Sequence, residues 1–244
     1  MKRKTAGIVV IGDEILSGKV QDGNSFFMAR ELRARGVEVR RIVVIPDETE
    51  EIARTVRSFA EKFDLVFTSG GIGPTHDDVT IAGISAGFGV RPVIDEQLSL
   101  MLLRMYKELT PERLRMAEVP EGAELVSDGS PNLPAIRYRN VYILPGIPEL
   151  LVKKFIAIVK SFGDAPLILK KVYLNDEYES EIARTLNEIV KTHKDVKIGS
   201  YPVMGGKDYS VMVTFESLDE AHLDSAVSSL VRSLPPEKVV RVEG

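Results

Sequence analysis

The chain has 244 residues and a formal net charge of −4, with 44% hydrophobic and 28% charged residues. This balance is typical of a soluble globular protein, and it provides no global basic field that would attract nucleic acid or an anionic membrane. No cysteine is present, which excludes disulfides, thiol catalysis and cysteine-ligated zinc or iron–sulfur centres.

No stretch of the sequence resembles a membrane anchor or a signal peptide. None of its apolar runs approaches the length that crosses a bilayer. The first apolar run, residues 8–11, ends at Gly12 and is too short for the core of a secretory signal. We therefore expect a cytoplasmic protein without membrane partners, and its net acidity also argues against a nucleic-acid partner.

The first two thirds of the chain alternate apolar, β-branched runs with amphipathic segments. Strands are expected at residues 5–11, 37–45, 65–67, 124–126, 135–138 and 141–144. Helices are expected at residues 25–35, 48–62, 95–108 and 149–162, with further helix starts at Val79 and Pro111. Strands that alternate with helices predict an α/β domain whose mostly parallel sheet is covered on both faces.

The rhythm changes after residues 163–166, which we take as the boundary between domains 1–165 and 166–244. Strands at 167–174, 196–202, 209–216 and 238–242 alternate with helices at 178–191 and 218–232, and a Gly205–Gly206 turn joins the middle strands. This βαββαβ order predicts a small ferredoxin-like α+β domain. Its mild acidity, 10 Lys and Arg against 13 Asp and Glu from residue 167 onward, favours a structural or oligomerisation module.

The glycine-rich stretch at residues 68–80 carries the strongest functional signal. It follows an apolar strand, opens a helix, and reads Thr68, Ser69, Gly70, Gly71, Ile72, Gly73, Pro74, Thr75, His76, Asp77, Asp78, Val79, Thr80. A strand, a glycine turn and a helix start place backbone N–H groups and a positive helix end around an anion. The adjacent carboxylates would repel a bare phosphate, so a bridging cation is the simplest way to reconcile them.

Each of these loop residues also has a purely structural alternative. The stretch could be a tight βα turn in which Asp77 or Asp78 caps the helix. His76 could donate a proton to a leaving phosphate or be a solvated loop residue, and we favour the second.

Polar residues follow the other predicted parallel strands as well. Gly12, Asp13 and Glu14 follow the first strand, Asp47 follows the second, and a Pro145–Gly146 turn follows the strand at 141–144. Ligands of parallel α/β sheets bind at the carboxyl ends of the strands. We therefore expect these segments and the glycine loop to meet at one edge of the sheet.

The same residues resemble a known family. Residues 1 to about 162 are similar to the molybdopterin-binding domain family of MogA and MoaB, and within it to the CinA-like proteins. The matching motifs, in family order, are residues 12–16 with Asn24, residues 46–47, residues 70–75 with Asp77, Asp78 and Thr80, residues 119–123 and residues 144–148. Residues 128–135 depart from the family's Asn-x-x-Gly-Thr-Ala-Pro-Gly segment, because they keep the proline and lack both glycines.

The resemblance implies a three-layer α/β/α domain, and it makes residues 166–244 similar to the small, KH-like middle domain of CinA-like proteins. Since the chain ends at Gly244, the resemblance gives no reason to expect the deamidase activity of longer relatives. It implies instead the metal-dependent hydrolysis of ADP-ribose or a related dinucleotide to AMP and a sugar phosphate. A homo-oligomer, at least a dimer, is expected because relatives of this kind are commonly oligomeric.

The roles implied by this resemblance can be assigned to residues. Asp47, Asp78 and Glu14 are the expected catalytic residues, and Asp47 and Asp78 would hold a divalent Mg, Mn or Co ion. The expected nucleotide-binding residues are Gly12, Asp13, Asn24, Thr68, Ser69, Gly70, Gly71, Ile72, Gly73, Pro74, Thr75, Asp77, Pro145 and Gly146. The alternatives are molybdopterin adenylylation or binding, FAD hydrolysis, and a non-catalytic nucleotide- or pterin-binding regulator.

Overall fold

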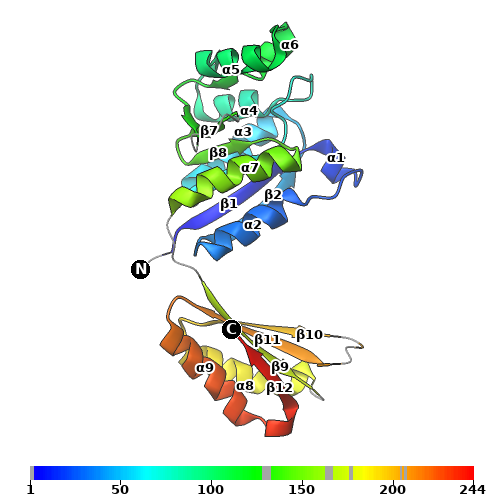
Figure 1. Ribbon diagram of the computed structural model, residues 1–244, viewed down its shortest axis with the longest axis vertical. Coiled ribbons are helices and arrows are strands. Elements are labelled where there is room, and N and C mark those ends of the chain that lie inside the picture. Colours follow the sequence, from blue (N-terminus) through cyan, green and yellow to red (C-terminus); the bar gives the residue numbers. More distant parts are fainter. Residues whose placement is uncertain (1–2, 128–132, 163–166, 176–177, 204, 206–207) are drawn as a thin grey trace. The chain divides into compact units, whose positions relative to one another are not determined.

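A computed structural model of the chain describes residues 3–127, 133–162, 167–175, 178–203, 205 and 208–244 (Figure 1). The chain divides into two compact units, Met1–Asp164 and Ala165–Gly244. The expected boundary at residues 163–166 lies outside the described residues, as do Gly206 of the predicted turn and residues 128–132 of the segment that departs from the family.

The larger unit contains a six-stranded sheet in the order β2–β1–β3–β8–β7–β6. Its strands are β1 (Thr5–Ile11), β2 (Glu38–Ile45), β3 (Leu65–Ser69), β6 (Glu124–Val126), β7 (Ala135–Tyr138) and β8 (Val141–Leu144). The four strands from β2 to β8 are parallel, and β7 and β6 continue the sheet antiparallel. The prediction of an α/β fold on a mostly parallel sheet is confirmed.

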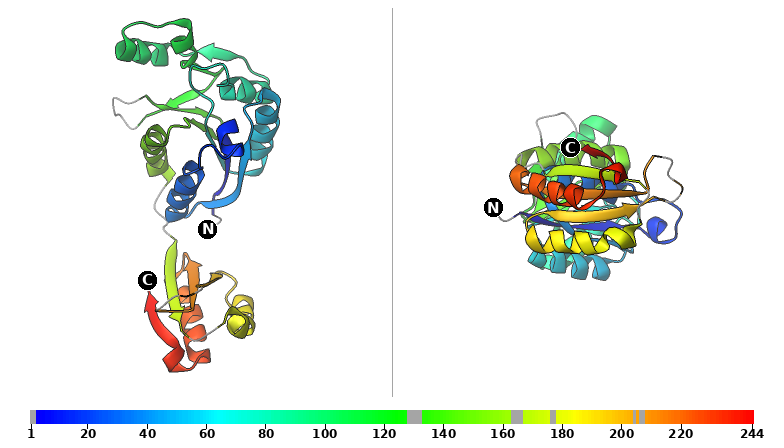
Figure 2. Two further views of the ribbon diagram at one scale, coloured as in Figure 1. Left: turned by 90° about the vertical axis from the view of Figure 1, so that its right-hand side faces the viewer. Right: turned by 90° about the horizontal axis from the view of Figure 1, so that it is seen from below.

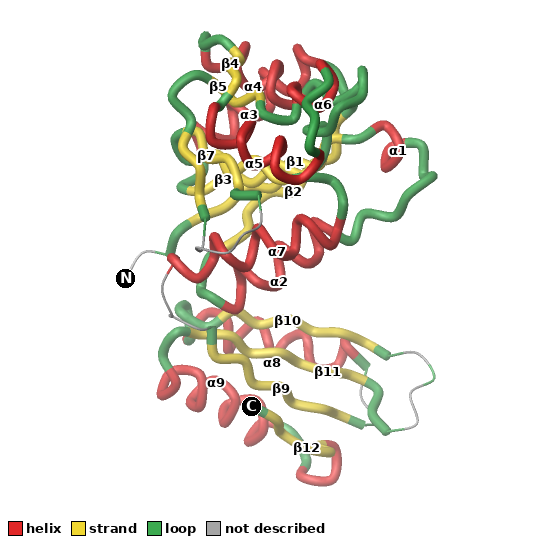
Figure 3. Tube along the Cα trace, turned by 45° about the horizontal axis from the view of Figure 1, so that its top comes forward, coloured by secondary structure: helices red, strands yellow, loops and turns green. Residues whose placement is uncertain are grey.

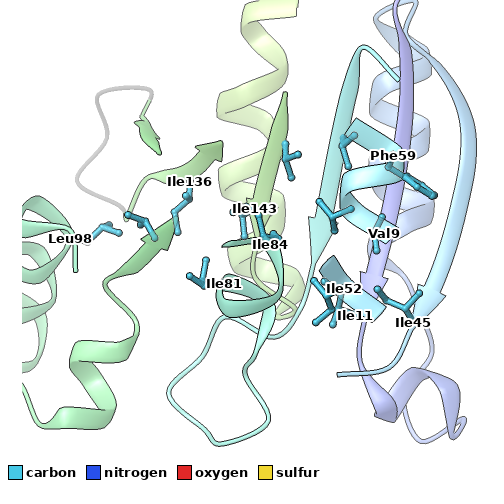
Figure 4. Close-up of a cluster of buried hydrophobic side chains, with 14 of the residues drawn as sticks. Val9, Ile11, Ile45, Ile52, Phe59, Ile81, Ile84, Leu98, Ile136 and Ile143 are labelled. Atoms are coloured by element: carbon cyan, nitrogen blue, oxygen red, sulfur yellow. The ribbon is translucent and has the colours of Figure 1, made fainter. Parts of the chain in front are cut away.

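Helices cover both faces of this sheet (Figure 2). One face packs on α3 (Thr49–Lys62), α4 (Thr80–Phe88) and α5 (Glu96–Tyr106), and the other on α2 (Asn24–Ala34) and α7 (Pro148–Val159). Side chains alternate along β1, so Val9 and Ile11 enter the first core while Ile8 and Val10 enter the second. Figure 4 shows Val9 and Ile11 beside Ile52 of α3. A strand buried on both faces must be apolar throughout, which explains the run at residues 8–11.

Three short elements of this unit were not predicted. A single helical turn, α1 (Asp13–Leu16), follows β1, and β4 (Pro92–Ile94) pairs antiparallel with β5 (Glu118–Pro120). A strand of three residues is too short to show a period of two, and prolines lie in both strands. The end of the helix predicted at 149–162 is also tighter than expected, because Lys160–Phe162 form a 3₁₀ turn, η1.

The smaller unit has a four-stranded antiparallel sheet in the order β10–β11–β9–β12 (Figure 3). Its elements are β9 (Ile168–Leu174), α8 (Glu179–Thr192), β10 (Lys197–Pro202), β11 (Val211–Ser217), α9 (Glu220–Ser233), η2 (Pro236–Lys238) and β12 (Val239–Glu243). Apolar residues of α8 and α9 pack on Val172, Val213 and Phe215 of the sheet. The βαββαβ plan is therefore confirmed, with the last strand beside the first.

Replacing Phe155 tests how much the second core of the larger unit contributes to the stability of the fold. Its side chain on α7 is fully buried, and its ring meets Phe67 edge-on at a centroid distance of 5.2 Å. We expect Phe155→Ala to lower the free energy of unfolding by about 3–5 kcal/mol, because it removes a buried ring and leaves a cavity. The matched control is Ile156→Ala at the next position, where the side chain is 38% exposed and the cost should be well under half as large. Urea denaturation followed by circular dichroism measures both, and equal costs would contradict the assignment.

Candidate functional site

The segments that follow the parallel strands meet at one edge of the sheet, as expected. After β1 and β2, the backbone N–H of Asp13 donates to Oδ2 of Asp47 at 2.9 Å. At the start of α2, Nδ2 of Asn24 donates to Oγ of Ser69 at 3.0 Å and to the carbonyl of Gly146 at 2.7 Å. Asn24 thus connects the ends of β3 and β8. An amide side chain suits this position because its NH₂ group can donate two hydrogen bonds.

The glycine loop runs close against neighbouring strands. Gly70 has a φ of 112°, and a Cβ at this position would collide with the carbonyl oxygen of Ile11 at the end of β1. Gly71 has a φ of 63°, and a Cβ there would collide with Oγ1 of Thr80. Only glycine combines these backbone angles with such close approach. The loop is held by Thr80, whose Oγ1 donates to the carbonyl of Gly70 at 2.9 Å and whose N–H donates to that of Gly71 at 3.0 Å.

Asp78 braces the loop from within and does not cap a helix. Its Oδ1 accepts the N–H of Gly73 at 2.6 Å, and its Oδ2 accepts the N–H and Oγ1 of Thr75 at 2.8 and 2.5 Å. The N-cap of α4 is Val79, with no side-chain cap. The structural alternative in which Asp77 or Asp78 caps this helix is therefore wrong, because the carboxylate turns back to the loop that precedes it.

These bonds decide which loop amides can hold an anion. The N–H of Gly70 donates to the carbonyl of Leu144 at 3.1 Å, and that of Gly73 to Asp78. Among the described residues, the N–H groups of Gly71 and Ile72 donate to no protein acceptor. The predicted set of loop donors from Gly70 to Gly73 thus narrows to these two neighbouring amides, which is the geometry of a small anion nest.

Asp47 is the carboxylate with the most unusual environment. Burial raises the pKa of Asp47 above its ordinary value, the N–H of Asp13 lowers it, and the charge of Glu14 raises it further. Asp13 and Asp77 also raise the pKa of Asp47 through their charges. Its Oδ1 lies beside Gly71, where a Cβ would stand 3.2 Å away. A half-buried carboxylate among like charges, next to an anion nest, has the chemistry of a divalent-cation ligand.

The predicted metal pair of Asp47 and Asp78 stays a prediction, and the hydrogen bonds of Asp78 weigh against its part in the pair. Both oxygens of Asp78 already accept hydrogen bonds from the loop, so Asp78 has little capacity left for an ion. In the part of the chain that the structure describes, no three His, Asp or Glu side chains gather as a closed coordination shell. Magnesium-type ions in phosphate sites commonly use one or two carboxylates together with substrate phosphates, so Asp47 with Glu14 suffices.

A cavity of about 420 Å³ opens beside the glycine loop. The loop residues Gly70 to Pro74 form one wall with Pro145 and Gly146, while Glu14 and Asp78 add carboxylates. The remaining lining is largely apolar and comes from Leu98, Met116, Leu133, Pro134, Ile136, Ile147 and Leu150. This size and lining suit a small organic molecule that carries an anionic group.

Other predicted residues do not face this cavity. Thr68 is fully buried, and its Oγ1 has no partner among the described residues. His76 has a side chain 98% exposed, which confirms that it is a solvated loop residue. Thr75 and Asp77 remain in the loop, where a hydrogen bond from Thr75 lowers the pKa of Asp77.

Two cations at the site were missed from the sequence. Arg115 of α6 (Pro111–Arg115) donates to the carbonyls of Thr75 and Asp78 at 3.0 and 3.2 Å, so it supports the loop from a distant segment. Lys154 of α7 lines the cavity. Nothing in the sequence distinguishes Lys154 from its exposed neighbour Lys153, because both lie in an ordinary amphipathic helix.

Residues 7–164 match the family "Probable molybdopterin binding domain", and the chain belongs to this family. Residues 166–243 match the "FAD synthase, middle domain" family. The crystal structure of CinA from Thermoplasma acidophilum, described as of unknown function, is 34% identical with a TM-score of 0.61, and the match covers 66% of this chain and 98% of that chain. The family resemblance and its CinA-like branch are therefore confirmed.

Two further relatives align along most of this chain. An Archaeoglobus fulgidus protein is 36% identical over 220 residues, which cover 90% of this chain and 93% of that protein. The "Probable FAD synthase" of Caenorhabditis elegans is 30% identical over 257 residues, 94% of this chain and 50% of its own length. The chain thus spans about half of that enzyme. Among the described residues, no helix is long and apolar enough to cross a membrane.

The hydrogen bonds of Asp78 lead to a prediction that distinguishes a residue that braces the glycine loop from a residue that binds an ion. In Asp78→Asn, one acceptor oxygen becomes an NH₂ group that faces an N–H of the loop. We expect the free energy of unfolding to fall by about 1–3 kcal/mol, because a loop donor loses its acceptor. A metal ligand without a bracing role would leave the stability of the metal-free protein unchanged or raise it.

The control for Asp78 is Asp77→Asn at the exposed neighbouring position, which should change stability by less than about 0.5 kcal/mol. Denaturant titration of both variants in chelator decides the point. Equal stability of Asp78→Asn and the unmodified protein would contradict the bracing role.

Proposed function

We propose that the larger unit hydrolyses the diphosphate bond of a nucleotide such as ADP-ribose, releasing AMP and a sugar phosphate. One observation carries this proposal: two free amides of the glycine loop lie on the wall of a largely apolar cavity, and the raised-pKa carboxylate of Asp47 lies beside Gly71 of that loop. The amides suit a phosphate, and the apolar walls suit a planar base.

The chain's own residues would divide the work as follows. The N–H groups of Gly71 and Ile72 would bind and orient the diphosphate, and they would stabilise charge that builds up on its oxygens. Asp47 or Glu14 would take the proton of an attacking water. That water forms the new P–O bond while the bridging P–O bond breaks, and the released phosphate carries the electron pair. Asp78, Thr80 and Arg115 would keep the loop in shape throughout.

Asp47 and Glu14 would hold a divalent cation, which would neutralise the like charges that raise the pKa of Asp47. When bound, such an ion supplies charge neutralisation of the diphosphate and a more acidic water. Its identity as Mg, Mn or Co stays a prediction, and so does the homo-oligomer.

FAD is a second candidate substrate, and a specific observation favours it. Residues 166–243 match the middle domain of FAD synthase, and a probable FAD synthase aligns with 94% of this chain. FAD, like ADP-ribose, contains an AMP half joined through a diphosphate. The glycine loop and Asp47 would treat both in the same way, so the cavity walls must distinguish the second half.

A substrate panel tests the proposal directly. We expect AMP release from ADP-ribose or FAD in the presence of Mg²⁺, Mn²⁺ or Co²⁺, with no such release in chelator. Chromatography of the products with each ion identifies the substrate, and ATP with molybdopterin serves as the comparison for adenylyl transfer. Absence of AMP from both diphosphates with all three ions would refute hydrolysis, and tight binding without turnover would favour a regulator.

Asp47→Asn should reduce turnover while stabilising the metal-free protein. We expect at least about a hundredfold loss of AMP release, equivalent to about 3 kcal/mol of transition-state stabilisation. Because the folded-state pKa of Asp47 is raised, its ionised form costs stability above that pKa, and this cost disappears as the pH falls through it. The melting temperature of Asp47→Asn should therefore exceed that of the unmodified protein at pH 7, and the gain should vanish in acid.

The matched control for Asp47 is the exposed Glu48→Gln, which should change neither activity nor melting temperature by much. Differential scanning calorimetry in chelator and the AMP assay on the same preparations provide both readouts. A hundredfold loss of activity with a lower melting temperature would indicate a structural role for Asp47 instead.

A further inference from the structure

Lys154 is a cation that the proposed chemistry has not used. It lies on α7, two turns beyond the helix start, and its side chain forms part of the wall of the 420 Å³ cavity. Its Nζ donates to the carbonyl of Leu133 at 2.9 Å and to that of Pro134. An ammonium has three donors, so one N–H remains after these two bonds.

The environment of Lys154 disfavours its charge. Burial lowers the pKa of Lys154 to about 8, more than two units below that of a free lysine. No carboxylate compensates this, since salt bridges in the described part of the chain do not include Lys154 and burial is the single cause of the change. Two carbonyl dipoles offset only part of the lost hydration.

Other ionisable groups lie on α7, on the elements that pack against it and around the cavity. Glu14 and Asp78 share the cavity. The ionisable groups on α7 itself or on the packed elements are Glu149, Lys153, Lys160, Arg30, Glu31, Arg33, Arg137, Tyr138 and Tyr142. None of them shifts the pKa of Lys154. An anionic ligand is the simplest partner for a half-buried cation on a cavity wall.

We propose that Lys154 forms a second anion subsite in the cavity, which binds a phosphate of the substrate together with the free amides of the glycine loop. This inference rests on the proposed function, whose substrate class it narrows. A ligand held at both points has an extended anionic region, as a nucleoside diphosphate or a diphosphate-linked dinucleotide has, and a nucleoside monophosphate has not. Lys154 acts by positioning the substrate, and no bond forms or breaks at its Nζ.

A purely structural role for Lys154 makes a different prediction. If Lys154 only holds the carbonyls of Leu133 and Pro134 in place, its replacement should lower the stability of the fold. Ligand affinity should then not depend on whether Lys154 is ionised. If it binds the ligand, affinity must weaken as the ammonium loses its proton above pH 8. The phosphates of ADP are already fully ionised above pH 7.5, so they add no titration in that range.

The experiment is calorimetric titration of the full chain with ADP, in Mg²⁺ and in chelator, because the carboxylates beside the loop would repel a diphosphate that has no cation. For the unmodified protein we expect the Kd of ADP to rise up to about twentyfold between pH 7.5 and 9.5, as the charged fraction of a group with a pKa of about 8 falls. Lys154→Met should bind at least about tenfold more weakly at pH 7.5, with a flat pH profile. Lys153→Met, at the exposed neighbouring position, should match the unmodified protein.

If Lys154→Met fails to fold, Lys154→Arg still tests the inference. A guanidinium stays charged throughout this range, so the arginine variant should bind ADP at pH 7.5 and lose the pH dependence. Unchanged affinity in Lys154→Met, or the original pH profile in Lys154→Arg, would overturn the inference. Hydrolysis of ADP-ribose or FAD together with such a result would leave the proposed function standing, whereas a confirmed ADP profile without any turnover would refute only the hydrolysis.

Discussion

The close approach of Gly70 to the end of β1 is the constraint on which the site depends. No side chain fits between its Cα and the carbonyl of Ile11, and its N–H is fixed on Leu144 of β8. The loop is therefore anchored between two strands before it turns toward α4. That anchoring brings Gly71 beside Asp47, which follows β2, so three strand ends share one small volume. A larger residue at Gly70 would move the loop and with it both free amides.

Hydrogen bonds within the protein do not fully compensate the charged groups at the cavity. The cluster of Asp47, Glu14 and Asp13 has like charges that raise the pKa of Asp47, and Lys154 is held by carbonyls alone. Both arrangements cost stability in the free protein. Folded proteins retain such costs where a ligand compensates them, and a cation bound to a diphosphate would compensate both at once.

The sequence predicted the sheet, the convergence of the strand ends and the glycine loop, because each depends on local patterns and on the rule that parallel strands share one carboxyl edge. It could not predict the role of Asp78, since capping, bracing and ion binding place the same residue at the same position. The role of Lys154 could not be predicted from the sequence for a different reason. Its importance comes from burial beside Leu133 and Pro134, about 20 residues away in sequence, and no periodicity encodes that contact.

The loop offers few groups that could distinguish one phosphate-bearing ligand from another. Asp78, Thr80 and Arg115 fix several polar groups of the loop, and the amides of Gly71 and Ile72 on the cavity wall stay available to a ligand. Two amides can recognise a phosphate but not the molecule attached to it. If the proposed function holds, discrimination between adenosine, flavin and pterin groups would fall to side chains of the cavity wall such as Leu98, Met116 and Leu150.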